Sequence, residues 1–230
     1  MSGKAYERFN IHHRIQHIMM FVSFFICTFT GIAIKYDQSS YARGFTRLLG
    51  GFENLLALHL VGAAIMLIGS CLYHLVYLLV YALVTRKLSF EALPTLKDFQ
   101  DLYQNLKYFL GLSPEKPKFT RFSYKEKFDY WAVFWGIFII GGSGLMMWFP
   151  DVAAKFFPRY IIDAARAAHS DEAILAIVVI FTWHFFNVHF NPDFFPGSLV
   201  WFHGKLTEEQ MEEEHPMELK KLLKVKGREG

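Results

Sequence analysis

Residues 54–85, NLLALHLVGAAIMLIGSCLYHLVYLLVYALVT, decide the fold, because these 32 residues contain no Asp, Glu, Lys or Arg. An α-helix rises about 1.5 Å per residue, so roughly 20 apolar residues cross the ~30 Å hydrocarbon core of a bilayer. This stretch is therefore long enough to span a membrane. Three other windows are also free of charged residues, at 18–34, 130–150 and 173–192.

The four windows predict an all-α integral membrane protein, built as a four-helix transmembrane bundle. We expect the spans at residues 16–35, 53–85, 128–149 and 169–190. Apolar residues make up 53% of the 230-residue chain. Four spans use most of them, which leaves little for a separate soluble core. The membrane domain is therefore expected over residues 1–205 and a charged tail over residues 206–230.

The positive charges indicate the orientation in the membrane. Of the 24 Lys and Arg residues, 18 lie before the first span, in the long connection 86–129 or in the tail. The loops 35–53 and 151–172 contain the other six. Because Lys and Arg favour the cytoplasmic side, both termini are expected in the cytoplasm. The net charge of +3 is too small to indicate a nucleic-acid partner.

The long connection is expected to contain an interfacial helix. Leu and Phe recur at helical spacing over residues 89–112, and charged residues occupy the opposite face, which is typical of an amphipathic helix at the membrane surface. In the tail, a short helix is expected after Thr207.

Histidines are the residues that indicate the chemistry. Ionisable side chains are costly inside a membrane and usually have a function there. Of the ten histidines, six lie in a predicted span or at its edge: His17, His59, His74, His169, His184 and His189. The two cysteines are too few for an iron–sulfur cluster, and no CxxCH motif for covalent haem attachment occurs.

The histidine spacing predicts two facing pairs. His59 and His74 are 15 residues apart, and so are His169 and His184. In an α-helix this separation is about 22 Å of rise and about 60° of rotation beyond four turns. The second and fourth spans run in the same direction, so His59 is expected to meet His169 near the outer surface. By the same geometry, His74 is expected to meet His184 near the inner surface.

Two histidines that face each other at each of two depths are typical of bis-imidazole haem. Imidazole nitrogen is a strong axial ligand, and six-coordinate iron transfers electrons without an open position for substrate. Zinc prefers about four ligands in a tetrahedron, which separated histidine pairs do not supply. The sequence therefore predicts two b-type haems across the bilayer.

The remaining two histidines leave several arrangements open. His17 and His189 both lie at the inner face. They could bind a third haem. Alternatively, His17 could pair with His184 or His189, and His74 would then have another role. One of them could instead line a quinone pocket.

Several stretches carry a family resemblance over residues 8–205. They are Arg14-Ile15-Gln16-His17 before a span that ends in Thr30-Gly31, Leu58-His59 with Gly62, residues 128–148 (FDYWAVFWGIFIIGGSGLMMW), and His169. In these features the chain resembles the four-span cytochrome b subunits of membrane-bound formate dehydrogenases, nickel–iron hydrogenases and thiosulfate-type reductases, the bacterial b561-like group. His74 and residues 184–196 (HFFNVHFNPDFFP) look like the subgroup that accompanies multihaem c-type cytochromes.

The resemblance implies which histidines hold the haems. His59 and His169 match the ligands of the outer haem. His17 matches one ligand of the inner haem, and its second ligand is either His184 or His189. Two haems are expected, or three if all six histidines are ligands.

The resemblance also implies the biological role. Such a subunit of the bacterial cytoplasmic membrane exchanges electrons between menaquinone or ubiquinone and a periplasmic iron–sulfur or multihaem c-type subunit. Quinone is expected near the inner haem, where His12, His13, Asn191 and His189 are the nearest polar side chains. The alternatives are a stand-alone transmembrane b-type quinol-oxidising reductase and a haem-free metal or ion transporter. The chain has no nucleotide fingerprint or catalytic triad, which favours an electron-transfer subunit of a larger oxidoreductase complex.

Overall fold

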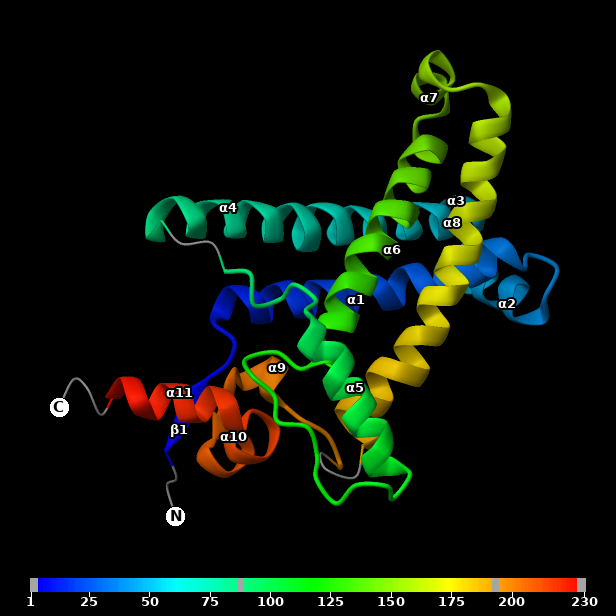
Figure 1. Ribbon diagram of the computed structural model, residues 1–230. Coiled ribbons are helices and arrows are strands. Elements are labelled where there is room, and N and C mark those ends of the chain that lie inside the picture. The colour runs from blue at the N-terminus through cyan, green and yellow to red at the C-terminus, as the bar shows by residue number, and fades with distance from the viewer. Residues whose placement is uncertain (1–3, 87–88, 192–194, 227–230) are drawn as a thin grey trace. The chain divides into compact units, whose positions relative to one another are not determined.

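The computed structural model describes residues 4–86, 89–191 and 195–226 (Figure 1). Four of its helices are long and apolar enough to cross a membrane: Ile11–Lys35, Phe52–Thr85, Tyr124–Trp148 and Arg159–Phe190. They confirm the predicted all-α membrane architecture. The fourth begins ten residues before the predicted start at 169, because residues 159–172 are helical although they include five charged side chains.

The described chain forms two compact units. The histidine unit comprises residues 11–86, 133–191 and 195–197. The terminal unit comprises residues 4–10, 89–132 and 198–226.

In the histidine unit, the first span is a single helix and the second changes its winding midway. The first is α1 (Ile11–Lys35), and the second is α3 (Phe52–Ala64), the π-helical η1 (Ile65–Leu72) and α4 (Tyr73–Thr85). α1 lies alongside α3 and η1 (Figure 1). A π-helix bonds residue i to i+5 and winds more residues into each turn, often at a functional site.

A glycine permits the close approach of α1 and α3. A Cβ atom at Gly62 would lie 2.7 Å from Ile26 Cγ2 and 2.9 Å from Cys27 Sγ. Small residues at such positions let membrane helices pack backbone against backbone. Any larger residue at position 62 would separate the two helices.

The loops that join the spans of this unit contain short helices. These are α2 (Ser40–Leu48) and α7 (Pro150–Phe156). The third span is α6 (Tyr124–Trp148), which belongs to this unit from residue 133 on, and the fourth consists of α8 (Arg159–Val179), η2 (Ile180–His184) and η3 (Phe186–Phe190). Ser39 begins α2 by accepting a hydrogen bond from Ala42 N at 3.0 Å. Ala42 then packs with Ala33 and Leu55 in a small buried cluster.

The terminal unit joins the two ends of the chain. β1 (Ala5–Glu7) pairs antiparallel with β2 (Lys205–Thr207). Its helices are α5 (Leu96–Phe109), the first residues of α6, α9 (Val200–His203), α10 (Glu208–Glu214) and α11 (Pro216–Lys226). The tail is thus helical after Thr207, and residues 227–230 lie outside the described chain.

The core of this unit is small. It consists of Tyr6, Leu206, Met211 and Leu219. α5 is shorter than the predicted 89–112, because Thr95 and Asp98 form a capping box that begins the helix.

Buried ion pairs reinforce the terminal unit. Arg8 is 3% exposed, and its Nη2 donates to Arg121 O at 2.5 Å and to Glu126 Oε1 at 3.1 Å. Lys127 Nζ donates to Asp98 Oδ2 at 2.9 Å. Burial, together with the nearby Glu126 carboxylate, raises the pKa of Glu214 to about 7.

Candidate functional site

The first histidine pair joins α3 to α8. The rings of His59 and His169 have centroids 6.3 Å apart and planes at 69°. His59 Nδ1 lies 2.8 Å from Thr30 Oγ1, and the Thr30 hydroxyl lies 2.6 Å from Ile26 O. Because a carbonyl only accepts, the hydroxyl donates to Ile26 and accepts from His59 Nδ1–H. His59 therefore carries its ring lone pair on Nε2.

The ring of His169 is oriented in a similar way, by a hydrogen bond from its Nδ1. His169 Nδ1 lies 2.9 Å from Ile140 O, so it donates to that carbonyl and leaves the lone pair on Nε2. Ser143 Oγ lies 3.3 Å from the same nitrogen and donates to Ile139 O at 2.6 Å. Metal-binding histidines are commonly held in this way, by a hydrogen bond to the ring nitrogen that does not face the metal.

Glycines make room for both rings. A Cβ atom at Gly144 would lie 3.0 Å from His169 Cε1, which is tighter than ordinary contact. A Cβ atom at Gly31 would lie 3.4 Å from His59 Cε1, at the limit of ordinary contact. The backbone therefore passes close to the edges of both imidazoles.

The second pair joins α1 to the fourth span. His17 and His184 have ring centroids 6.4 Å apart and planes at 37°. His184 is the last residue of η2. Among the arrangements that the sequence left open, the structure thus brings His17 beside His184.

π-Helical winding explains why α-helical spacing did not decide this pairing. Eight π-helical residues (η1) lie between His59 and His74, and five (η2) end at His184, so both rotations are smaller than 15 α-helical residues give, and by different amounts. Instead, His74 Nδ1 lies 2.8 Å from Gln16 Oε1. Gln16 precedes His17 in α1 and belongs to the Arg14–His17 stretch that resembles the family, but no role was predicted for it, although an amide in a largely apolar helix is a signal.

The other candidate residues lie in two places. His12 Nδ1 lies 2.7 Å from Tyr73 Oη, and both His12 and His13 have ring centroids 5.1 Å from that of Tyr77. At the end of the fourth span, a Cβ atom on Gly197 would meet the His189 ring. Asn191 is buried there, and its backbone N–H donates to Phe186 O at 2.7 Å. His12 and His13 thus lie against tyrosines of α4, whereas His189 and Asn191 lie at the end of the fourth span.

The two histidine pairs fit an iron held between two imidazoles. An imidazole nitrogen lies about 2 Å from its metal and the ring centre about 1 Å farther, so two rings on one metal have centroids about 6 Å apart. The observed separations are 6.3 and 6.4 Å. Among the described residues, no group of three or more His, Cys, Asp or Glu side chains could hold a metal ion. The residues therefore fit haem, in which the macrocycle supplies the other four ligands.

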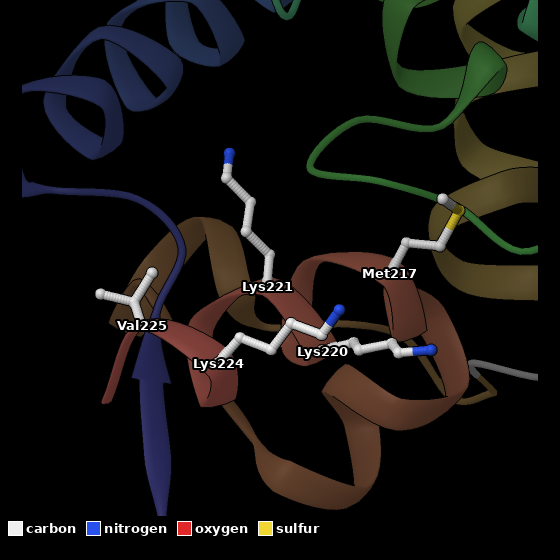
Figure 2. A pocket seen from close by; sticks show the side chains of 5 residues that line it. All are labelled: Met217, Lys220, Lys221, Lys224 and Val225. Carbon is white, nitrogen blue, oxygen red and sulfur yellow. The ribbon is translucent and has the colours of Figure 1, made fainter. Parts of the chain in front are cut away.

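A surface hollow in the terminal unit takes no part in this site. It is lined by side chains of α11: Met217, Lys220, Lys221, Lys224 and Val225 (Figure 2). Lys221 points away from Lys220 and Lys224 and lies 3.3 Å from Glu91 Oε1. The hollow is basic and contains no histidine.

Comparison with known families agrees with the site. The family described as "Prokaryotic cytochrome b561" matches residues 8–195, which include all six histidines of the predicted spans. No curated protein matches the chain. Since the match covers most of the chain and all four membrane helices, the chain belongs to the prokaryotic cytochrome b561 family of membrane proteins that bind b-type haem and transfer electrons.

Proposed function

We propose that the chain transfers electrons between the membrane quinone pool and a periplasmic redox subunit, through two b-type haems. His59 and His169 hold one haem, and His17 and His184 hold the other. Haem iron supplies reversible one-electron transfer when it is bound. The paired imidazoles of this chain would hold the iron and leave it the single task of electron transfer.

One observation carries this proposal most directly. Both ring pairs have the separation that a single metal between two imidazoles requires. In the 59–169 pair, the hydrogen bonds of both Nδ1 atoms also put the lone pairs on Nε2. This arrangement is prepared for a metal and would be an unusual way to pack four apolar helices.

The charge distribution supports the proposed sidedness. With both termini in the cytoplasm, the 59–169 pair lies near the periplasmic ends of its helices, and the 17–184 pair lies near the cytoplasmic ends. At the 59–169 end, Lys35 Nζ ties α1 to the fourth span, at 2.9 Å from Asp171 Oδ1 and 2.6 Å from Ser170 Oγ. An iron–sulfur or multihaem c-type subunit would exchange electrons at this end.

Quinone would react at the 17–184 end. His12 and His13 lie there, in contact with tyrosines of α4. Asn191 is buried at the close of the fourth span, whereas His12 is exposed, so the α1 side is the better candidate for binding the head group.

The test uses two single variants of the full chain. Menadiol, a soluble naphthohydroquinone, is mixed with the purified oxidised protein, and haem reduction is followed by absorbance. In His59→Ala, the remaining haem is expected to be reduced at close to the wild-type rate. In His17→Ala, the remaining haem is expected to respond slowly to menadiol but fully to dithionite, because its route from quinone is lost.

Two results would contradict the proposal. One is a wild-type protein whose haem is not reduced by menadiol, which would remove the quinone role. The other is the reverse pattern in the two variants, which would place quinone at the 59–169 end.

A further inference from the structure

His74 is held in one orientation by a neighbouring amide. Its Nδ1 lies 2.8 Å from Gln16 Oε1. An amide oxygen only accepts, so His74 donates from Nδ1 and carries its lone pair on Nε2. Catalytic histidines are oriented by such a hydrogen bond to the other ring nitrogen.

Gln16 is costly to the fold, which indicates a role other than stability. It is 7% exposed. Within the described part of the chain, its enclosed Nε2 has no hydrogen-bond partner. A buried polar atom without a partner destabilises the folded state. An apolar residue at position 16 would avoid this cost, so the bond to His74 is the benefit that the amide provides.

Polar side chains continue from His74 toward the start of α1. His12 Nδ1 lies 2.7 Å from Tyr73 Oη, and its ring stacks on Tyr77 with centroids 5.1 Å apart. His12 is four residues before Gln16, about 6 Å closer to the helix end. His12 is also exposed. These groups form a polar strip along α1 and α4, next in sequence to His17.

We propose that His74 is the proton acceptor for hydroquinone oxidation and that Gln16 positions it. This inference rests on the proposed function and deepens it. Oxidation breaks both hydroquinone O–H bonds and yields quinone, two electrons and two protons. A bound b-type haem would take up the electrons one at a time. Each proton goes to His74 Nε2 and is released to water before the next is accepted. Quinone reduction is the reverse.

Three variants of the full chain test this role. His74→Leu removes the acceptor, and general-base catalysis typically contributes 10²- to 10⁴-fold, so menadiol should reduce the haem at least ~100-fold more slowly. Gln16→Leu removes only the positioning bond and should slow the reaction about tenfold. Gln16→Glu keeps an acceptor for Nδ1–H and should restore a rate close to wild type. Tyr81→Phe, on the same helix, is the matched control.

Two measurements are independent of turnover. The haem content of each variant should equal that of the wild type. The fluorescent quinone analogue 2-heptyl-4-hydroxyquinoline N-oxide should bind about tenfold more weakly to His74→Leu, because one hydrogen bond to its head group is lost. Binding to the Tyr81→Phe control should not change.

The failures are distinguishable. Loss of a haem in His74→Leu would overturn the inference, because His74 would then be an axial ligand. Full haem content with unchanged rate and analogue affinity would overturn it as well. If Gln16→Leu lowers the haem content, its rate is set aside, and the menadiol rate and analogue affinity of His74→Leu decide the test. A wild-type protein that neither binds the analogue nor responds to menadiol would refute the proposed function itself.

Discussion

The two histidine pairs have similar ring separations but different surroundings. His59 and His169 lie in α-helical segments, and the hydrogen-bond partners of both rings are Thr30 and a backbone carbonyl. His184 ends a π-helical segment, and its partner His17 lies one residue after Gln16. The first pair is held by neutral groups that do not titrate. The second adjoins a strip of imidazole, amide and phenol groups.

The difference matches two tasks of one electron path. A haem that only exchanges electrons needs a rigid site whose ligands are fixed by neighbouring groups. A haem that meets quinone also needs nearby side chains that exchange protons. The 59–169 pair suits the first task, and the 17–184 pair suits the second.

Removal of a ligand has the largest effect. Each of the single variants His59→Ala and His17→Ala should lose one haem per chain and keep the other, because the pairs have no residue in common. Pyridine haemochrome analysis of the purified variants measures this loss. His189→Gln serves as the comparison and should keep the full haem content. Full content in His59→Ala would show that this histidine is not a ligand.

Crowding one ring should have a smaller effect on one pair. A Cβ atom at Gly144 would lie 3.0 Å from His169 Cε1, so Gly144→Ala should displace that ring and lower occupancy of the 59–169 haem to roughly half or less. Gly31→Ala introduces a Cβ at 3.4 Å from His59 and should be tolerated. Haem content and the absorbance spectrum distinguish the two. Equal effects of both substitutions would mean that ring position is not limited by the backbone here.

Loss of the hydrogen bond to His59 should change the potential more than the occupancy. In Thr30→Val the Nδ1–H of His59 loses its acceptor, so the imidazole donates less electron density to ferric iron. The potential of that haem should rise by on the order of 50 mV, since a tenfold change in a one-electron equilibrium is about 59 mV. A redox titration measures it. Thr30→Ser and Thr28→Val, at another buried threonine of α1, should leave both potentials unchanged.

A change in the terminal unit should leave both pairs intact. Burial, with the Glu126 carboxylate nearby, raises the pKa of Glu214 to about 7. Because the folded pKa lies above the unfolded value, the folded form binds more protons at intermediate pH. The stability of α10 should therefore fall as pH rises from about 4.5 to 7, by on the order of 1–2 kcal/mol, and level off above.

Hydrogen exchange of the α10 amides at pH 5.5 and 8 measures this dependence. Glu214→Gln should remove it without changing the haem content. A pH dependence that persists in the variant would assign it to another group.

The spans and the site were not equally predictable from the sequence. Charge-free windows predicted all four membrane helices, because a charge inside the hydrocarbon core is costly wherever the helices pack. The spacing also predicted that His59 and His169 would be neighbours, since α-helical geometry holds around both. In contrast, α-helical arithmetic paired His74 with His184, and the π-helical winding of η1 changes the rotation on which that arithmetic depends.

Other features depended on tertiary contacts that no periodicity encodes. The role of Gln16 depends on its hydrogen bond to His74, which is 58 residues away in the sequence. The pairing of β1 with β2 joins segments about 200 residues apart, each only three residues long. Such short strands have no recognisable alternation in the sequence.

The most direct test of the account is the amount of haem b per polypeptide in the detergent-purified wild-type chain. Pyridine haemochrome gives the haem, and quantitative amino-acid analysis gives the protein. The account predicts two haems, one for each histidine pair. A ratio of three would contradict it, because His74 or His189 would then have to be a ligand, and a ratio of one or none would show that at least one pair does not bind iron.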